Sequence, residues 1–314
     1  MHAQNPGKYP IEKLCRMLGI RKQAYYKRKG DSTARKAVKE AFALEYIHKI
    51  REQAPGIGGV KIWYMYRRDF PDKDLVGRDR FEDIINNHGL KVRAKRRKVR
   101  TTDSSHGLPV FPNLAYDFIP TAINQLWVSD ITYIPVWLNE EEYTFCYLAL
   151  IMDAYSHEII GWAVGATLET LHACEALKMA FSRLNAVDEE IVKRLIHHSD
   201  RGVQYASKDY VGLMQGRGIR ISMTERGNPK DNALAERINS TMKNELLKGL
   251  RFTCIKEVRD AIAAAVEFYN TARPHMSVDM MTPEEAAKWN GEIHKWWRSY
   301  REEAIKRELS DANP

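Results

Sequence analysis

The stretch Trp127-Val-Ser-Asp-Ile-Thr-Tyr-Ile134 decides the fold, because it reads as a buried strand that carries a carboxylate, Asp130, in its second half. The strand is predicted over residues 126–134. Residues 143–154 form an almost continuous apolar run, which is typical of a central strand covered on both faces. A third strand, over 158–164, is predicted to pair with the second through the turn that follows it. The pattern therefore opens with three antiparallel strands.

Beyond these strands, helical and extended patterns alternate. The predicted elements are an amphipathic helix over 171–184, strands over 191–198 and 219–223, and a helix over 231–247. The order of elements indicates an α/β core in which helices pack on a mixed sheet.

Two further acidic residues stand in distinctive frames. Asp200 follows the predicted fourth strand in His197-His-Ser-Asp-Arg-Gly-Val-Gln-Tyr205, and Glu236 lies on the predicted helix in Gly227-Asn-Pro-Lys-Asp-Asn-Ala-Leu-Ala-Glu-Arg237. Each carboxylate alone has an ordinary reading, as a turn residue or an exposed helix residue. Together with Asp130 they predict a metal site, because two divalent cations can hold the attacking and leaving oxygens of a phosphodiester displacement, and Mg²⁺ prefers carboxylate oxygens.

The frames resemble the catalytic core of the IS three family of bacterial insertion-sequence transposases, over roughly residues 120–285. The resemblance is carried by Trp127, the Asp-Ile-Thr run, Ser-Asp-Arg-Gly, Asp-Asn-Ala-Leu-Ala-Glu, Lys243 and Tyr269-Asn-Thr-Ala-Arg-Pro-His275. It implies an RNase H-like fold of the retroviral integrase superfamily. It also implies a DNA transposase that cleaves element ends and transfers the freed strand, acting on terminal inverted repeats and target DNA as a homo-oligomer.

The resemblance assigns roles to the carboxylates. Asp130, Asp200 and Glu236 become the catalytic residues and the ligands of two Mg²⁺ ions, with Mn²⁺ as a substitute. The ion between the two aspartates is expected to activate the nucleophile, and the ion between Asp130 and Glu236 to stabilise the leaving oxygen. Asp153 also ends a strand, but it lacks the Asp-Ile-Thr frame and is interpreted as a turn residue.

Other polar residues near the carboxylates have competing interpretations. Lys243, two helical turns after Glu236, is predicted to contact DNA, the alternative being a solvated lysine. Asn232 is predicted to orient the helix start or a phosphate, the alternative being an N-cap. His197 and His198 are interpreted as structural, because His is a poor ligand for Mg²⁺.

The basic charge is concentrated in the first third of the chain. Residues 1–107 hold 26 Lys and Arg against 12 Asp and Glu, a net charge of +14, whereas the other 207 residues have a net charge of −6. Residues 1–90 are predicted to form an all-α, helix-turn-helix DNA-binding region, with helices over 11–18, 21–28, 34–53, 60–68 and 78–88. The alternative is a helical bundle with a packing role alone.

Residues 91–115 are predicted to be a basic linker that tracks a phosphate backbone. Its positive charges are Lys91, Arg93, Lys95, Arg96, Arg97, Lys98 and Arg100. As a bare pattern such a run is more often a solvated tail. The catalytic core is then expected over 116–283 and a terminal helix over 284–314. Trp289, Trp296 and Trp297 are predicted to lie on that helix and to pack on the core or on a partner subunit.

The remaining features narrow the class of protein. The four scattered cysteines exclude a disulfide framework and a cysteine-based zinc site. No apolar run is long enough to span a bilayer, so a cytoplasmic, nucleoid-associated bacterial protein without membrane contact is expected. The chain has no sustained heptad repeat. The resemblance therefore implies a partner from an upstream reading frame that carries a helix-turn-helix and a leucine zipper. A DNA-binding repressor with an inert core, and a nuclease that cuts without joining, are the alternative functions.

The linker generates a salt-dependence prediction. If about four of its seven charges each neutralise one phosphate, changing all seven to Ser should flatten the slope of log K against log[salt] by roughly 3–4 units. The loss should be similar for element-end and random DNA, because phosphate contacts do not read bases. A salt titration of DNA binding measures the slope, and an unchanged slope would identify the run as a solvated tether.

Overall fold

The computed structural model of the chain describes residues 10–28, 31–71, 73–92, 107–184, 188–225 and 232–311. Contacts divide the chain into two compact units, residues 1–49 with 66–91 and residues 50–65 with 92–314. The sequence predicts one helical region over 1–90, so the grouping of residues 50–65 with the second unit is a difference from that expectation. Within the described ranges, no helix combines the length and the apolar character needed to cross a membrane.

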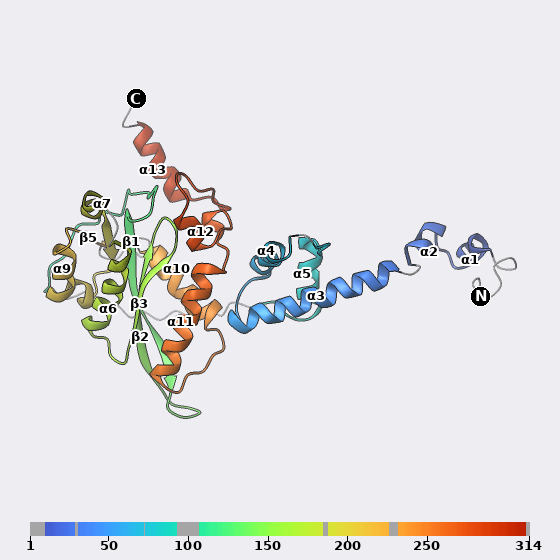
Figure 1. The fold of residues 1–314 in the computed structure, drawn as a ribbon, viewed down its shortest axis with the longest axis horizontal. Helices are drawn as coiled ribbons and strands as arrows, with labels where there is room; N and C mark the ends of the chain where they lie inside the picture. The colour runs from blue at the N-terminus through green and yellow to red at the C-terminus, as the bar shows by residue number, and fades with distance from the viewer. Residues whose placement is uncertain are drawn as a thin grey trace. The chain divides into compact units, whose positions relative to one another are not determined.

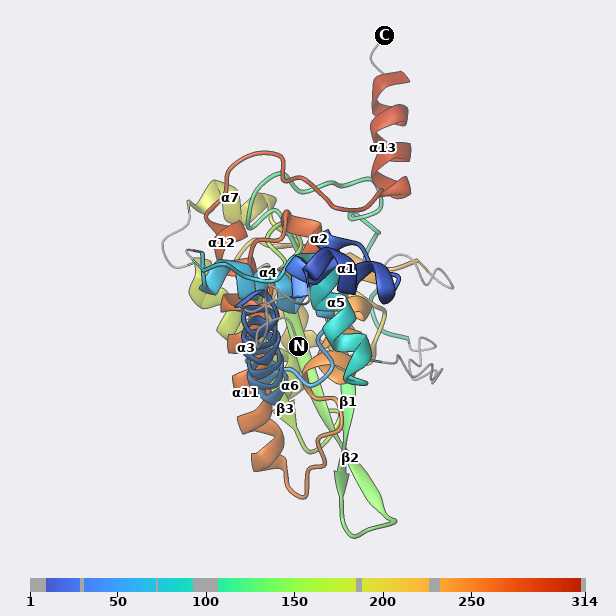
Figure 2. The same cartoon turned by 90° about the vertical axis from the view of Figure 1, so that its right-hand side faces the viewer.

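The second unit is built on a five-stranded mixed sheet of order β3-β2-β1-β4-β5 (Figure 1, Figure 2). The strands are β1 (Leu126–Trp137), β2 (Tyr143–Asp153), β3 (Ile159–Gly165), β4 (Ile196–Ser199) and β5 (Arg220–Met223). β1, β2 and β3 pair antiparallel, whereas β4 pairs parallel with both β1 and β5. This order confirms the predicted RNase H-like core.

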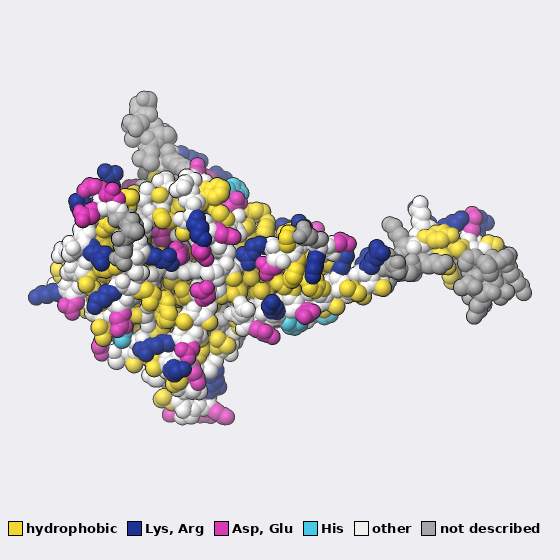
Figure 3. Space-filling view, viewed as in Figure 1, with side chains coloured by type: hydrophobic (Ala, Val, Ile, Leu, Met, Phe, Trp, Pro, Cys, Tyr) yellow, Lys and Arg dark blue, Asp and Glu magenta, His cyan; other side chains and the backbone are white. Residues whose placement is uncertain are grey.

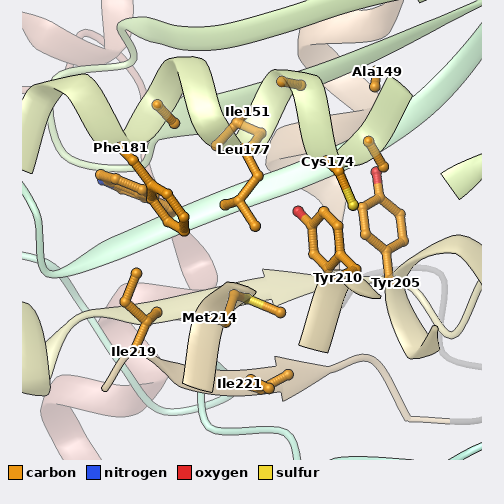
Figure 4. Packing of buried hydrophobic residues seen from close by; sticks show 14 of the residues in the cluster. Ala149, Ile151, Cys174, Leu177, Phe181, Tyr205, Tyr210, Met214, Ile219 and Ile221 are labelled. Carbon is orange, nitrogen blue, oxygen red and sulfur yellow. The ribbon is translucent and has the colours of Figure 1, made fainter. Parts of the chain in front are cut away.

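Helices cover both faces of the sheet. α6 (Thr170–Phe181), α8 (Val203–Ala206) and α9 (Lys208–Gln215) pack with Trp127 of β1 in one apolar core, whose α6 and α9 side chains interdigitate in Figure 4. α10 (Ala233–Thr241) packs on β1 and α11 (Ile255–Thr271) on β3, on the other side of the sheet (Figure 1). Side chains alternate along a strand, so Asp130, three residues after Trp127, projects toward the α10 side.

The predicted strand over 191–198 is wrong in its first half. Residues Glu189–Arg194 form a helix, α7, and the strand β4 is short. The helix is started by Asp188, whose carboxylate accepts a hydrogen bond of 2.8 Å from the Glu190 backbone, a standard N-cap. Of the apolar residues that suggested an extended strand, Val192 is buried by this short helix and Ile191 is exposed.

The predicted helix over 231–247 has two parts. α10 ends at Thr241, and Met242–Leu246 continue as a π-helical turn. A π-turn inserts one extra residue per turn, and such turns are often found at functional sites. Asp231 lies outside the described residues.

The single terminal helix predicted over 284–314 is also wrong. α12 (Pro283–Ala287) is short, and α13 (Tyr300–Asp311) begins after a non-helical segment that contains Gly291 at a φ of +97°. The tryptophans lie in this segment and not on a helix: the indole nitrogen of Trp296 donates to Asp279, and that of Trp297 to Ser277. Both therefore pack on the catalytic unit.

The first unit is helical, as predicted. α1 (Ile11–Met17) and α2 (Lys22–Arg28) are joined by a turn at Gly19, and α3 (Asp31–Gln53), α4 (Gly59–Asp69) and α5 (Arg78–Asn87) follow. Its core is a cluster of rings in mutual contact, formed by Phe42, Tyr46, Tyr66, Phe70 and Phe81. α3 and α4 each contribute residues to both units.

Asp153 is a turn residue, as the sequence indicates, and the structure shows that it is buried. Its carboxylate accepts hydrogen bonds from the backbone amides of Asn124, Tyr155 and Ser156 and from the Ser156 hydroxyl, at 2.8–3.1 Å. Burial raises the pKa of Asp153, and the four donors oppose that effect. The side chain thus fixes the turn between β2 and β3.

Replacing Asp153 with Asn should destabilise the fold. The NH₂ group of the new Asn side chain would face the backbone amides that now donate to the Asp153 carboxylate. Some of these buried N–H groups would be left unpaired, which costs about 1–3 kcal/mol. Thermal or urea unfolding measures the change. Asp117→Asn, at an exposed carboxylate, is the matched control and should shift stability by less than about 0.5 kcal/mol; equal effects of the two substitutions would contradict the assignment.

Candidate active site

The register of two parallel strands brings two of the predicted carboxylates together. β1 and β4 pair residue by residue at a constant offset, with Trp127 opposite His197 and Val128 opposite His198. The ladder ends at Val128 and His198, and each aspartate follows two residues later in its own strand direction. Both carboxylates therefore emerge at the same end of the paired strands, where the charge of Asp200 acts on Asp130.

A tight turn presents Asp200 at the end of β4. Its Oδ1 accepts a 2.9 Å hydrogen bond from the backbone amide of Gly202, and the Arg201 side chain donates to the Thr224 carbonyl. A Cβ at Gly202 would lie 2.9 Å from the same carboxylate oxygen. The Ser-Asp-Arg-Gly frame therefore needs its glycine so that the backbone can approach the carboxylate closely.

α10 carries Glu236 and is fixed to β1 beside Asp130. The Asn232 side chain, buried at the start of the helix, donates a 3.0 Å hydrogen bond to the Ser129 carbonyl. One turn after Glu236, the Asn239 side chain donates a 2.9 Å hydrogen bond to Oδ2 of Asp130. These two amides set the rotation of the helix, which leaves Glu236 exposed to solvent in its first turn.

Asn232 occupies the N-cap position without capping the helix. Its amide nitrogen is used by Ser129, so the interpretation in which it orients the helix start is supported, whereas a phosphate contact stays a prediction. Asn239 was not identified from the sequence. Its spacing of seven residues from Asn232 puts both amides on one face of the helix, and that spacing is the feature that predicts its position.

The electrostatics couple Asp130 to each of the other two carboxylates. The pKa of Asp130 is raised to about 7, first by burial and then by the negative charges of Asp200 and Glu236, while hydrogen bonds from Asn239 and Ile131 oppose the rise. Burial also raises the pKa of Glu236. A carboxylate that lies close to two others is stabilised when it binds a proton or a cation, because either one reduces the repulsion between the charges.

The three carboxylates suit two divalent cations, each held by two carboxylate ligands. Among the described residues, no three His, Cys, Asp or Glu side chains are gathered closely enough to hold a single ion. Two ions that share Asp130 need only two carboxylates each, because Mg²⁺ takes its other ligands from water and substrate oxygens. The buried Oδ1 of Asn239 also has no hydrogen-bond partner, which leaves an oxygen acceptor beside Asp130. These groups fit hard cations.

Lys243 lies on the same side as the carboxylates. Its ammonium group stands 4.1 Å from the centroid of the Tyr133 ring. Burial lowers the pKa of Lys243, and the charge of Asp130 opposes that effect. The side chain is therefore held close to Asp130, where a phosphate bound to the site would meet it, but contact with DNA itself stays a prediction.

The histidines of the His-His-Ser-Asp frame are structural. His197 is fully buried and its Nε2 lies 3.0 Å from the Tyr210 hydroxyl, while Nδ1 of His198 lies 2.8 Å from the Ser222 hydroxyl. Burial lowers the pKa of His197 to about 3, so its ring is neutral. The two rings connect β4 to α9 and β5, and the interpretation of both histidines as structural residues is supported.

A buried ion cluster, missed in the sequence, anchors the π-turn that holds Lys243. The guanidinium of Arg273 donates to both oxygens of Glu245, at 2.6 and 3.0 Å, and Lys61 donates to Oε2 at 2.9 Å. Burial opposes the charge of Glu245, yet Arg273 and Lys61 hold its pKa below the usual value. Burial lowers the pKa of Lys61 to about 8.

The cluster also fixes the segment before α4. The backbone amide of Gly56 donates a 2.7 Å hydrogen bond to the Glu245 carbonyl, and a Cβ at Gly56 would lie 2.4 Å from the carbonyl oxygen of Asn244. Only glycine lets this segment lie so close to the π-turn.

The structure explains the Tyr269-Asn-Thr-Ala-Arg-Pro-His275 motif. Asn270 binds both backbone groups of Ile159 through its amide, which docks α11 on β3. Arg273 holds Glu245 and also donates to the buried ring of His275 at 2.7 Å. The motif therefore contributes to the scaffold around the site, where the sequence showed only a recurring pattern.

The predicted DNA-binding residues of the linker are mostly not described. Lys91 is exposed at the end of the first unit. Arg93, Lys95, Arg96, Arg97, Lys98 and Arg100 lie outside the described residues, so the role of this run stays a prediction.

Comparison with known proteins gives consistent matches. Residues 120–229 and 217–283 each match the family described as Integrase core domain. A 31 kDa protein of insertion element IS600 from Shigella sonnei is 38% identical, over 67% of this chain and 74% of its own length. A putative transposase for insertion sequence element IS986/IS6110 from Mycobacterium tuberculosis is 30% identical, over 85% of this chain and 94% of its own length.

A third relative and a solved structure are also similar to this chain. The transposase InsF for insertion sequence IS3A from Escherichia coli is 33% identical, over 64% of this chain and 67% of its own. The HTLV-2 integrase catalytic core domain, solved in complex with magnesium, is 18% identical with a TM-score of 0.39, over 53% of this chain and 97% of that one.

The raised pKa of Asp130 predicts a pH-dependent stability of the metal-free protein. The pKa is about 7 in the fold and about 4 in an unfolded chain, so the folded state binds more protons between these values. The stability contributed by the protonated carboxyl is therefore lost as the pH rises through about 7. Between pH 5 and 8 in EDTA, wild type should lose about 2–3 kcal/mol relative to Asp130→Asn.

Urea unfolding of both proteins at the two pH values measures this difference. The substitution also changes the hydrogen bonds of residue 130, but that effect is the same at both pH values and cancels in the comparison. A stability gap between the proteins that stays constant from pH 5 to pH 8 would contradict the raised pKa.

Proposed function

This chain belongs to the IS three family of insertion-sequence transposases, enzymes with an integrase catalytic core, and we propose that it cleaves element ends and joins them to target DNA at Asp130, Asp200 and Glu236. The reaction frees a 3′-hydroxyl at the end of the element and uses it to attack another phosphodiester. No covalent bond between protein and DNA is needed.

One observation carries the proposal. The register of β1 with β4 makes Asp130 and Asp200 neighbours, and the charges of Asp200 and Glu236 both raise the pKa of Asp130. In the metal-free fold, the negative charges of Asp200 and Glu236 therefore disfavour ionisation of Asp130, and a bound cation would offset this repulsion. Repulsion that is retained in a fold is typical of a site made for cations.

Each residue has a defined task. Mg²⁺, for which Mn²⁺ substitutes, would be held by Asp130 with Asp200 and by Asp130 with Glu236, and would polarise the attacking and leaving oxygens. Asn239 holds Asp130 in position through Oδ2. Lys243, beside Asp130, binds a phosphate that flanks the scissile bond. The helical first unit and the basic linker bind the DNA, and two or more copies of the chain act on the paired element ends.

Single substitutions of the carboxylates test the proposal. Asp130→Asn, Asp200→Asn and Glu236→Gln should each lower Mg²⁺-dependent cleavage and joining by about 10³-fold or more, because ligand loss removes several kcal/mol of transition-state stabilisation. DNA binding measured in Ca²⁺ should change by less than about threefold, since Ca²⁺ accepts oxygen ligands but in looser geometry. Labelled element ends and their strand-transfer products are the readout.

Glu267→Gln, at an exposed carboxylate of α11, is the matched control and should keep full activity. Near-normal cleavage by any of the three carboxylate variants, or wild-type cleavage in EDTA, would overturn the proposal. Cleavage without joined products would identify a nuclease, and DNA binding without cleavage a repressor with an inert core.

A further inference from the structure

The outer half of the β1–β2 hairpin carries an aromatic face. Trp137 lies directly opposite Tyr143 in the strand register, and Tyr133 and Phe145 lie on the same face because side chains alternate along strands. Their rings form a continuous chain, with centroids 4.9 Å apart for Tyr133 and Phe145, 5.3 Å for Phe145 and Tyr143, and 5.1 Å for Tyr143 and Trp137.

This aromatic face is open to solvent, in contrast to the other side of the hairpin. Tyr143 is 50% exposed and Phe145 is 37% exposed. On the opposite side Ile134, Val136 and Cys146 are buried, and Phe252 forms a backbone bridge to the hairpin there.

Asp130 precedes Tyr133 by three residues and therefore projects from the other face of β1. Lys243 links the two faces, because its ammonium group lies 4.1 Å from the Tyr133 centroid and interacts with the charge of Asp130. Exposed aromatic rings joined to a reaction site in this way indicate a binding surface.

Two cations lie on the aromatic face. The Lys243 ammonium stands 4.1 Å from the Tyr133 centroid and the Arg251 guanidinium 3.9 Å from the Trp137 centroid. Arg251 is held by the backbone carbonyls of Asn139 and Glu140. Within the described ranges, neither cation forms an ion pair with a carboxylate. The positive charge at both ends of the ring chain is therefore available to an anion.

We propose that the aromatic face, Tyr133 to Trp137 with Tyr143 and Phe145, is a stacking platform for an unpaired DNA strand that leaves the carboxylate site. This inference rests on the proposed function and adds the surface that the strand follows. Bases would stack on the exposed rings of Tyr143 and Phe145, and backbone phosphates would meet Lys243 and Arg251. Aromatic rings interleaved with cations are the pattern by which proteins hold single strands.

The geometry favours an unpaired strand over two other occupants. The base faces of a duplex are stacked on one another, so a duplex would bind the two cations through its phosphates but would not stack on the aromatic rings. A second copy of the same face would bring unpaired cations of like charge together. The path is short: four residues of strand separate Tyr133 from Trp137, about 13 Å at 3.3 Å per residue. That length matches roughly four nucleotides at 3.4 Å each.

The turn of the hairpin closes the path at its far end. Residues 138–142 join β1 to β2 and include Glu140, Glu141 and Glu142. In Figure 3 acidic side chains gather at the lower end of the molecule, where Figure 1 places this turn, and basic side chains lie further up. A polyanion is attracted along the face and repelled at the turn, which limits the strand to the length of the ring chain.

The test compares two DNA probes on the full chain in Ca²⁺. One duplex ends in three unpaired nucleotides, one of them 2-aminopurine, and the other has the same sequence fully paired. Phe145→Ala should bind the first probe about 5–100-fold more weakly and the second within about twofold of wild type. Wild type should quench 2-aminopurine fluorescence by stacking, and Phe145→Ala should not.

Two further variants separate stacking from folding. Phe145→Trp keeps a ring and should restore both affinity and quenching. Tyr116→Ala removes an aromatic side chain that is 55% exposed elsewhere and should leave both probes unaffected. Equal loss of affinity for the two probes, or unchanged binding of the unpaired probe, would overturn the platform. Unchanged binding together with a smaller sedimentation coefficient would assign the face to a second copy.

The two proposals fail in different experiments. Binding in Ca²⁺ needs no turnover, so the stacking result stands even if a carboxylate variant keeps its cleavage. Conversely, Asp130→Asn could lose cleavage while Phe145→Ala binds the unpaired probe normally. That result would support the catalytic proposal and overturn the proposal of a stacking platform.

Discussion

The site depends on the parallel pairing of β1 with β4. The hydrogen bonds between these strands fix their register. The backbone therefore brings Asp130 close to Asp200, although 70 positions separate them in the sequence. Backbone hydrogen bonds thus hold two like charges together that would separate in solution. A slip of one residue would turn Asp130 to the apolar α6 side, so the register carries both the core and the chemistry.

The third carboxylate is positioned by side chains. The amides of Asn232 and Asn239 fix α10 on β1, and the Glu245–Arg273 pair fixes the π-turn that follows. A buried ion pair contributes little net stability, but loss of one partner is costly because the other is left uncompensated. Such pairs define one arrangement of the helix and exclude others, which a site for closely spaced cations requires.

The sequence predicted the parts of the fold that depend on local patterns. The apolar run of β2, the frames of the three acids and the buried role of Asp153 all follow from residue order, and the family resemblance supplied the sheet. It did not predict α7, because one apolar helical turn and a short strand look alike. The π-turn and the contacts of Asn239 and Arg273 depend on distant partners, and no local pattern encodes those.

The close fit of Gly56 against the π-turn has a consequence for how such chains are rearranged. Residues 50–65 precede the basic linker in the sequence, yet they fill part of the catalytic unit. The catalytic unit is therefore discontinuous in sequence. A chain cut in the linker would lose residues 50–65 of this unit, including Lys61. Fusion proteins that exchange the helices of the first unit must keep residues 50–65, so the exchangeable portion is interrupted and smaller than the chain order suggests.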